Sequence, residues 1–260
     1  MRHLLQRHPF PMRTRFAHSL VLTYALPPDL LRPLLPPGLA LDTYTDPAGA
    51  EHAFVAAALV DTRDLRPALL PAGLGIDRML TGYRIFTRFP TPGGRTMRGL
   101  KILRSDTDSR VMALGGNVFS RYHYRLARIG SRVVGDTLEF KVVSRDGRAD
   151  LHVRADLSGA PAALPAGSPF ATARDARRFA GPLPYTFEYE PQTRSMIVVK
   201  AVRTRWEPTP VAVEPVQRPT FFQHGPFAGT EPVLANAFHV AGLEYGWEAG
   251  QRRGENGAQL

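Results

Sequence analysis

The chain of 260 residues contains no cysteine. Disulfide bridges, thiolate zinc sites and cysteine nucleophiles are therefore excluded, and the absence agrees with a reducing compartment. No run approaches the roughly 18 consecutive apolar residues of a membrane-spanning helix. The N-terminal segment is basic but lacks the apolar core and cleavage site of a signal peptide. We therefore expect a cytoplasmic protein with no membrane partner.

Lysine is scarce, with Lys101, Lys141 and Lys200 only, so arginine supplies most of the net charge of +10. Arginine binds carboxylates through two parallel hydrogen bonds, although an arginine-rich genome explains the same composition. The arginines are spread along the whole chain, and no nucleic-acid reading motif with stacking aromatic residues accompanies them. We therefore expect no nucleic-acid partner.

Several motifs for metals, cofactors and nucleophiles are also missing. The histidines show no spacing typical of zinc ligands, so we expect no metal site. The pair Gly115-Gly116 does not complete a phosphate-binding loop, and the G-x-S-x-G elbow of serine hydrolases is absent. The sequence therefore predicts no cofactor.

Proline (24 residues) and glycine (23 residues) interrupt the chain at short intervals, which is typical of short strands joined by turns. Apolar runs and turn signals predict strands around 18–26, 39–44, 52–60, 83–89, 100–104, 122–128, 137–143, 149–155, 184–190 and 195–204, and helices around 27–35, 106–119 and 171–179. The short connections favour antiparallel pairing. We therefore predict a single mostly β (α+β) domain over 1–249, closed or nearly closed, with two or three short helices. The polar residues 250–260 predict a disordered tail.

The helix expected over 106–119 has an apolar pattern with two glycines inside it. Val111, Met112, Leu114 and Val118 are expected to face inward, and Thr107 or Asp108 is expected to cap the N-terminus.

The segment FAHSLVLTYALPPDLLRPLLPPGLALDTY, residues 16–44, resembles the opening of the YqjF-like family. This family is also called the domain of unknown function 2071 and belongs to the acetoacetate-decarboxylase-like superfamily. Weaker resemblance extends over 83–89, 98–106 and 175–213, so that it covers roughly residues 10 to 215. The resemblance implies a cone-shaped, antiparallel, barrel-like β domain around a central pocket.

In the decarboxylases of this superfamily, one pocket lysine forms a Schiff base and an adjacent lysine lowers its pKa. By order of elements, that lysine pair corresponds to residues 120–124 here, where no lysine stands. The resemblance therefore implies the pocket without the decarboxylase lysines. Arg121, Tyr122, His123 and Tyr124 occupy the place, either to contact a ligand or to fill the pocket. His123 is a candidate general acid or base.

Lys101 and Lys200 are the other candidate catalytic residues. Lys200 shares a strand face with Met196, Val198 and Val202, and Lys101 lies in a shorter apolar strand. A lysine held inside a barrel is an amine nucleophile for a Schiff base. A lysine at the rim instead extends its amine into water. The sequence leaves both interpretations open and favours the second.

Arg84, Arg88 and Arg121 lie on or beside strands expected to line the cone. Together with Tyr122 and Tyr124 they are the candidate ligand-binding residues, and the expected ligand is a small organic acid or carbonyl compound. Three functions stay open: a binding protein or enzyme of unassigned reaction, a scaffold with a filled pocket, and a Schiff-base lyase with a relocated lysine. An exposed edge strand would permit a homodimer.

Overall fold

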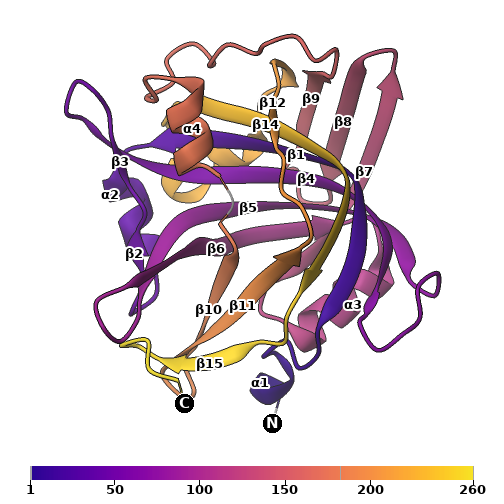
Figure 1. Cartoon of the computed structure of the whole chain (residues 1–260), viewed down its shortest axis with the longest axis vertical. Coiled ribbons are helices and arrows are strands. Elements are labelled where there is room, and N and C mark those ends of the chain that lie inside the picture. The colour runs from indigo at the N-terminus through magenta and orange to yellow at the C-terminus, as the bar shows by residue number, and fades with distance from the viewer. Residues whose placement is uncertain (1, 182, 260) are drawn as a thin grey trace.

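The computed structural model describes residues 2–181 and 183–259, and strands dominate it (Figure 1). The strands are β1 (Met12–Leu26), β2 (Ala40–Leu41), β3 (Tyr44–Thr45), β4 (Glu51–Pro67), β5 (Ile76–Pro90), β6 (Thr96–Thr107), β7 (Tyr124–Val134), β8 (Thr137–Ser144), β9 (Leu151–Asp156), β10 (Tyr185–Glu190), β11 (Ser195–Arg203), β12 (Thr209–Pro210), β13 (Val213–Gln217), β14 (Val233–Trp247) and β15 (Gln251–Gly254). The helices are α1 (Arg2–Leu5), α2 (Pro28–Leu31), α3 (Arg110–Phe119) and α4 (Ala173–Phe179), with 3-10 turns η1 (Arg32–Leu34), η2 (Thr220–Gln223) and η3 (Gly225–Phe227). The predicted mostly β class is confirmed.

Seven strands close into a ring in the order β6, β10, β11, β14, β1, β4 and β5, and β5 pairs again with β6. Most pairs are antiparallel, as the short connections predict, but β6 runs parallel to both β10 and β7. The connection from β6 to β7 contains α3, which supplies the crossover that parallel neighbours need. Among the described residues, no helix has both the length and the apolar character to cross a bilayer.

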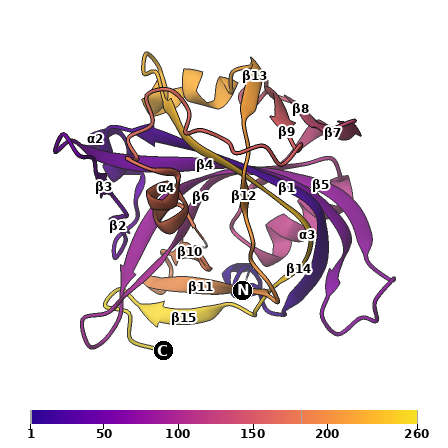
Figure 2. The same cartoon turned by 45° about the horizontal axis from the view of Figure 1, so that its top comes forward.

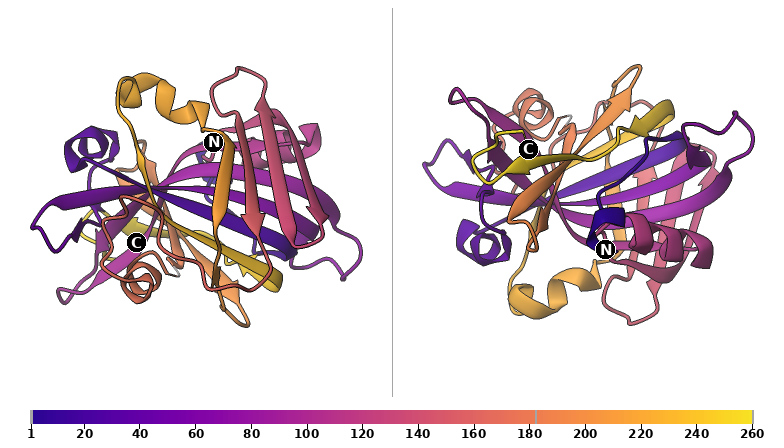
Figure 3. Two further views of the ribbon diagram at one scale, coloured as in Figure 1. Left: turned by 90° about the horizontal axis from the view of Figure 1, so that it is seen from above. Right: turned by 90° about the horizontal axis from the view of Figure 1, so that it is seen from below.

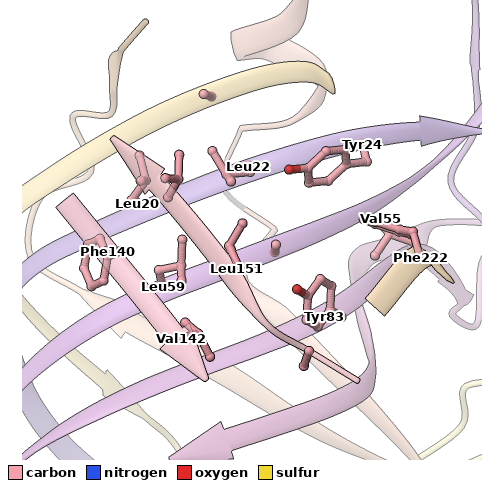
Figure 4. Packing of buried hydrophobic residues seen from close by; sticks show 14 of the residues in the cluster. Leu20, Leu22, Tyr24, Val55, Leu59, Tyr83, Phe140, Val142, Leu151 and Phe222 are labelled. Carbon is pink, nitrogen blue, oxygen red and sulfur yellow. The ribbon is translucent and has the colours of Figure 1, made fainter. Parts of the chain in front are cut away.

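A second layer continues the sheet outside the ring. The strands β7, β8, β9 and β13 pair in sequence and fold over the outer faces of β1 and β4 (Figures 2 and 3). Leu20 and Leu59 on the ring meet Phe140 and Leu151 on the second layer, and all four side chains are fully buried (Figure 4). This apolar interface, and not the ring interior, forms the main core.

Successive side chains of β4 point to opposite faces of the sheet, and this explains why residues 52–60 form a continuous apolar run. Val55, Ala57 and Leu59 face the second layer, whereas Ala56 and Ala58 face the ring interior. Both faces of the strand are covered, so both need apolar side chains.

Two expectations from the sequence differ from the structure. Residues 251–254 form β15, which pairs with 195–198 of β11, so this part of the expected tail is a strand. Backbone pairing at an edge requires no apolar side chains, and its polar composition therefore concealed the strand.

The other difference concerns α3, which begins at Arg110 with the Ser109 hydroxyl as its cap, while β6 continues to Thr107. Leu114, expected to face inward, is 71% exposed and lies outside the lining of the ring interior, so its assignment was wrong, whereas Val111 and Met112 do line the ring interior, although Val111 is also 71% exposed. The face toward the ring carries Gly115 and Gly116, which a search for apolar side chains overlooks.

Candidate functional site

A cavity of about 460 Å³ lies inside the ring, with β1, β4, β5, β6, β11 and β14 as walls and α3 across one side. Its volume falls in the range typical of small-molecule sites, roughly 300–1,000 Å³. Most lining side chains are apolar or aromatic, and none is an aspartate or glutamate.

The cavity is hollow because small residues occupy its walls. Ala56 and Ala58 are among the inward residues of β4, and Gly115 and Gly116 belong to the inward face of α3. A Cβ atom on Gly116 would lie 2.3 Å from the Tyr124 ring, so glycine is required for α3 to approach this wall.

Arg84 projects into this cavity from the middle of β5, between Ala56 of β4 and Ile102 of β6. Within the described part of the chain its guanidinium makes no ion pair and no hydrogen bond. Arg84 therefore brings an uncompensated positive charge into an apolar space.

Three tyrosines surround this charge. Burial raises the pKa values of Tyr122, Tyr124 and Tyr245, that of Tyr124 to about 12, and the charge of Arg84 partly opposes the increase for each. The three phenols are therefore protonated at neutral pH and are hydrogen-bond donors. The Tyr122 hydroxyl is buried, lies near Thr186, and forms no well-aligned hydrogen bond with the described residues.

Hydrogen bonds to their backbone groups hold Tyr122 and Tyr124 in place. The Asn117 side chain accepts from the Tyr124 amide at 2.7 Å and donates to the Tyr124 carbonyl at 2.9 Å. The Tyr122 amide donates to the Ser120 hydroxyl at 3.3 Å. The end of α3 therefore fixes both residues.

His8 is a lining residue that the sequence analysis did not identify. Its ring packs 4.6 Å from that of Tyr122, and burial lowers its pKa to about 4. Its amide donates to the Phe119 carbonyl and its own carbonyl accepts from Gly250, which hold it at a φ of 52°. No motif surrounds His8, so no spacing signal could have identified it.

Arg203, at the end of β11, is a second lining residue missed from the sequence. Its guanidinium lies over the Trp206 ring at 4.4 Å, and Phe16 stacks on Tyr245 at 4.4 Å nearby. Trp247 completes this aromatic wall. The position of Arg203 at a strand end gave no sign that it faces the interior.

The two candidate lysines lie outside the cavity lining. The Lys101 amine lies 3.3 Å from a carboxylate oxygen of Glu188 and donates to the Ile102 carbonyl at 2.9 Å. Burial raises the pKa of Glu188 to about 7, and Lys101 opposes this increase. The Lys200 side chain is 51% exposed and lies 3.7 Å from Glu248.

Three further candidates also lie outside the lining. His123 is exposed, with a φ of 52°. Arg121 lies 3.7 Å from Glu190, and Arg88 donates to the fully buried carboxylate of Asp42. Of the sequence candidates, the cavity therefore brings together Arg84, Tyr122 and Tyr124. Over residues 2–181 and 183–259 no group of three metal-ligating side chains forms.

Comparisons with known proteins agree with this architecture. The family model of DUF2071, described as an uncharacterized conserved protein, matches residues 13–240. Acetoacetate decarboxylase from Legionella pneumophila superposes with a TM-score of 0.58 at 16% identity, covering 94% of this chain and 87% of that one. The enduracididine biosynthesis enzyme MppR gives 0.54 at 14% identity, covering 95% and 89%.

An acetoacetate decarboxylase-like enzyme from Sphingomonas wittichii gives a TM-score of 0.51 at 15% identity, covering 98% of this chain and 96% of that one. These likenesses show the fold that the sequence resemblance implied. No curated protein sequence matches the chain significantly.

Proposed function

The chain belongs to the DUF2071 family, and we propose that it binds a small organic acid inside its barrel, with Arg84 as the partner of the acid group. The observation that carries this proposal is the placement of Arg84. It is a cation in a cavity of about 460 Å³ whose lining contains no acidic side chain.

A half-buried charge that faces an apolar cavity without a partner is costly, whereas a carboxylate facing a guanidinium forms short, charge-assisted hydrogen bonds. An incoming acid would therefore supply the partner that the described residues do not offer to Arg84. The protonated hydroxyls of Tyr122 and Tyr124 would donate to the same group or to a neighbouring carbonyl oxygen.

The aromatic and aliphatic walls favour an acid with an apolar body. In a protein of the same fold, MppR was solved with the condensation product of pyruvate and imidazole 4-carboxaldehyde, which joins a keto acid to a ring. That complex supports an organic acid as the ligand class here. The hollow interior favours binding over a scaffold with a filled pocket.

The test uses the two tryptophans of the chain, Trp206 and Trp247, which both line the cavity. Phenylacetate is titrated against the full chain while tryptophan emission is recorded, and phenylethanol serves as the uncharged analogue. We expect saturable quenching by phenylacetate and weaker binding of the alcohol. The variant R84Q should weaken phenylacetate binding by roughly tenfold to a hundredfold, the value of a hydrogen bond to a charged group, and leave phenylethanol binding unchanged.

The matched control is R128Q, because Arg128 is an exposed arginine on β7. R128Q should bind both compounds as the wild type does. Equal weakening of acid and alcohol in R84Q would contradict an ionic role for Arg84. Absence of saturable binding for phenylacetate and for other small carboxylates would overturn the proposal.

A further inference from the structure

Arg84 and Arg203 project into one cavity from walls that face each other. In the closed ring, β5 and β11 are separated by β6 and β10 on one side and by β4, β1 and β14 on the other. Both arginines belong to the lining, so the two guanidinium groups approach the same space from across the barrel.

Neither arginine has a carboxylate partner among the described residues, unlike the buried arginine elsewhere in the fold. Arg104 is 6% exposed and is paired with both Asp106 and Asp146. Burial, by contrast, lowers the pKa of Arg203, and the face of Trp206 is the neighbour that its guanidinium packs against. The cavity therefore holds two positive charges and no negative charge.

Tyr245 lies near both arginine side chains. It pairs with Arg203 across β11 and β14, and the charges of both Arg84 and Arg203 act on its hydroxyl. Its ring stacks on Phe16 and lies 5.0 Å from the ring of Trp247. The space between the two cations is therefore bounded by aromatic surface.

We infer that the preferred ligand is a dicarboxylic acid with an apolar spacer, one carboxylate facing Arg84 and the other facing Arg203. This inference rests on the proposed function and adds the second acid group. A monocarboxylate would compensate one guanidinium and leave the other without a partner in a partly desolvated site, which costs binding free energy. The spacer would lie against Phe16, Trp206 and Trp247.

The test compares unbranched dicarboxylates, from succinate to sebacate, with monocarboxylates of the same carbon number. Dissociation constants are measured on the full chain by calorimetry. We expect one spacer length for which the dicarboxylate binds at least about tenfold more tightly than its monocarboxylate, the gain expected from one more charge-assisted pair. R203Q should abolish this preference by weakening dicarboxylate binding more than monocarboxylate binding, whereas R84Q should weaken both classes strongly.

R203K and R128Q complete the set. R203K keeps the charge and should keep most of the preference, which separates the charge from any loss of packing on Trp206. R128Q should behave as the wild type. Thermal melting of each variant establishes that it is folded.

The outcomes separate this inference from the proposed function. If monocarboxylates bind saturably and as tightly as every dicarboxylate, the second acid group is refuted and the proposed function stands. If phenyl phosphate binds more tightly than every dicarboxylate, one dianionic head group replaces the two carboxylates and the inference is overturned. If no carboxylate binds, both fail.

Discussion

The rings of His18 and His239 contact each other, with Nδ1 of His18 3.1 Å from Nε2 of His239. The two residues lie on the neighbouring strands β1 and β14, on the face away from the cavity. Burial, together with the charge of protonated His18, lowers the pKa of His239 to about 4. At neutral pH one neutral ring therefore donates to the other.

This pair predicts a loss of stability in mild acid. The pKa of His239 lies below its value of about 6.5 in the unfolded chain, so the unfolded state gains the proton first as the pH falls. The contribution of neutral His239 to the unfolding free energy is complete above about pH 6.5 and is lost as the pH falls toward 4. H239Q should reduce the drop in unfolding free energy between about pH 7 and about pH 5 by about 1 kcal/mol. Urea unfolding of the wild type and of H239Q at the two pH values measures this difference. The raised pKa of Glu188 makes the unfolding free energy increase as the pH falls, but Glu188 is present in both proteins, so its effect cancels in the comparison.

Ala57 and Ala58 are adjacent on β4 but face opposite layers, which gives a matched pair of variants. A58L places a larger side chain in the cavity and should weaken phenylacetate binding by roughly tenfold or more without loss of stability. A57L places the same side chain in the packed core and should destabilise the fold by about 1–3 kcal/mol. Fluorescence titration and urea unfolding give the two readouts. Similar behaviour of the two variants would contradict the assignment of the faces.

The ion pairs of Asp42 predict that Arg88 stabilises the fold and does not bind the ligand. Its carboxylate is fully buried and accepts hydrogen bonds from Nε of both Arg88 and Arg98. D42N should lower the unfolding free energy by about 3 kcal/mol, because two arginines lose their anion. R88Q should cost about 1 kcal/mol, since Arg98 remains, and should leave phenylacetate affinity unchanged. Weakened binding in R88Q, measured by the same titration, would place Arg88 in the site.

The positions of Lys101 and Lys200 predict the result of borohydride trapping with pyruvate or acetoacetate. Their amines are directed to Glu188 and Glu248 and lie outside the cavity lining, so intact mass should show no adduct on either residue. A known Schiff-base enzyme serves as the positive control. A stoichiometric adduct on Lys101 or Lys200 would restore the relocated-lysine hypothesis.

The sequence predicted the strand content well because proline, glycine and apolar runs mark strand limits directly. It predicted the family from residues 16–44, and the inward positions of Arg84, Tyr122 and Tyr124 agree with that resemblance. It was harder to predict which charged side chains enter the cavity and which form ion pairs. Arg84 and Arg88 lie four residues apart on the same strand, yet one enters the cavity and the other pairs with Asp42.

The reasons for this difficulty are physical. The register of β5 on β6 is unbroken from Arg84 to Arg88, so the two arginines share a face and alternation cannot tell which one reaches the cavity. Elsewhere, as between Phe16 and His18, a register shift interrupts the alternation itself. Arg203 and His8 are placed by contacts with distant strands and loops. Arg203 pairs with Tyr245, and His8 with Phe119 and Gly250, all more than forty residues away in the chain, although Trp206, which also contacts Arg203, is close in sequence. Local patterns contain no trace of such contacts.

The pairing of β1 with β14 joins the first long strand to the last one. During synthesis β1 can pair with β4 early, but its other edge stays open until residues 233–247 have left the ribosome. Contacts of such large sequence separation slow folding and prolong the exposure of unpaired strand edges. We therefore expect ring closure to be the late step of folding, and we expect a chain that ends before β14 to aggregate.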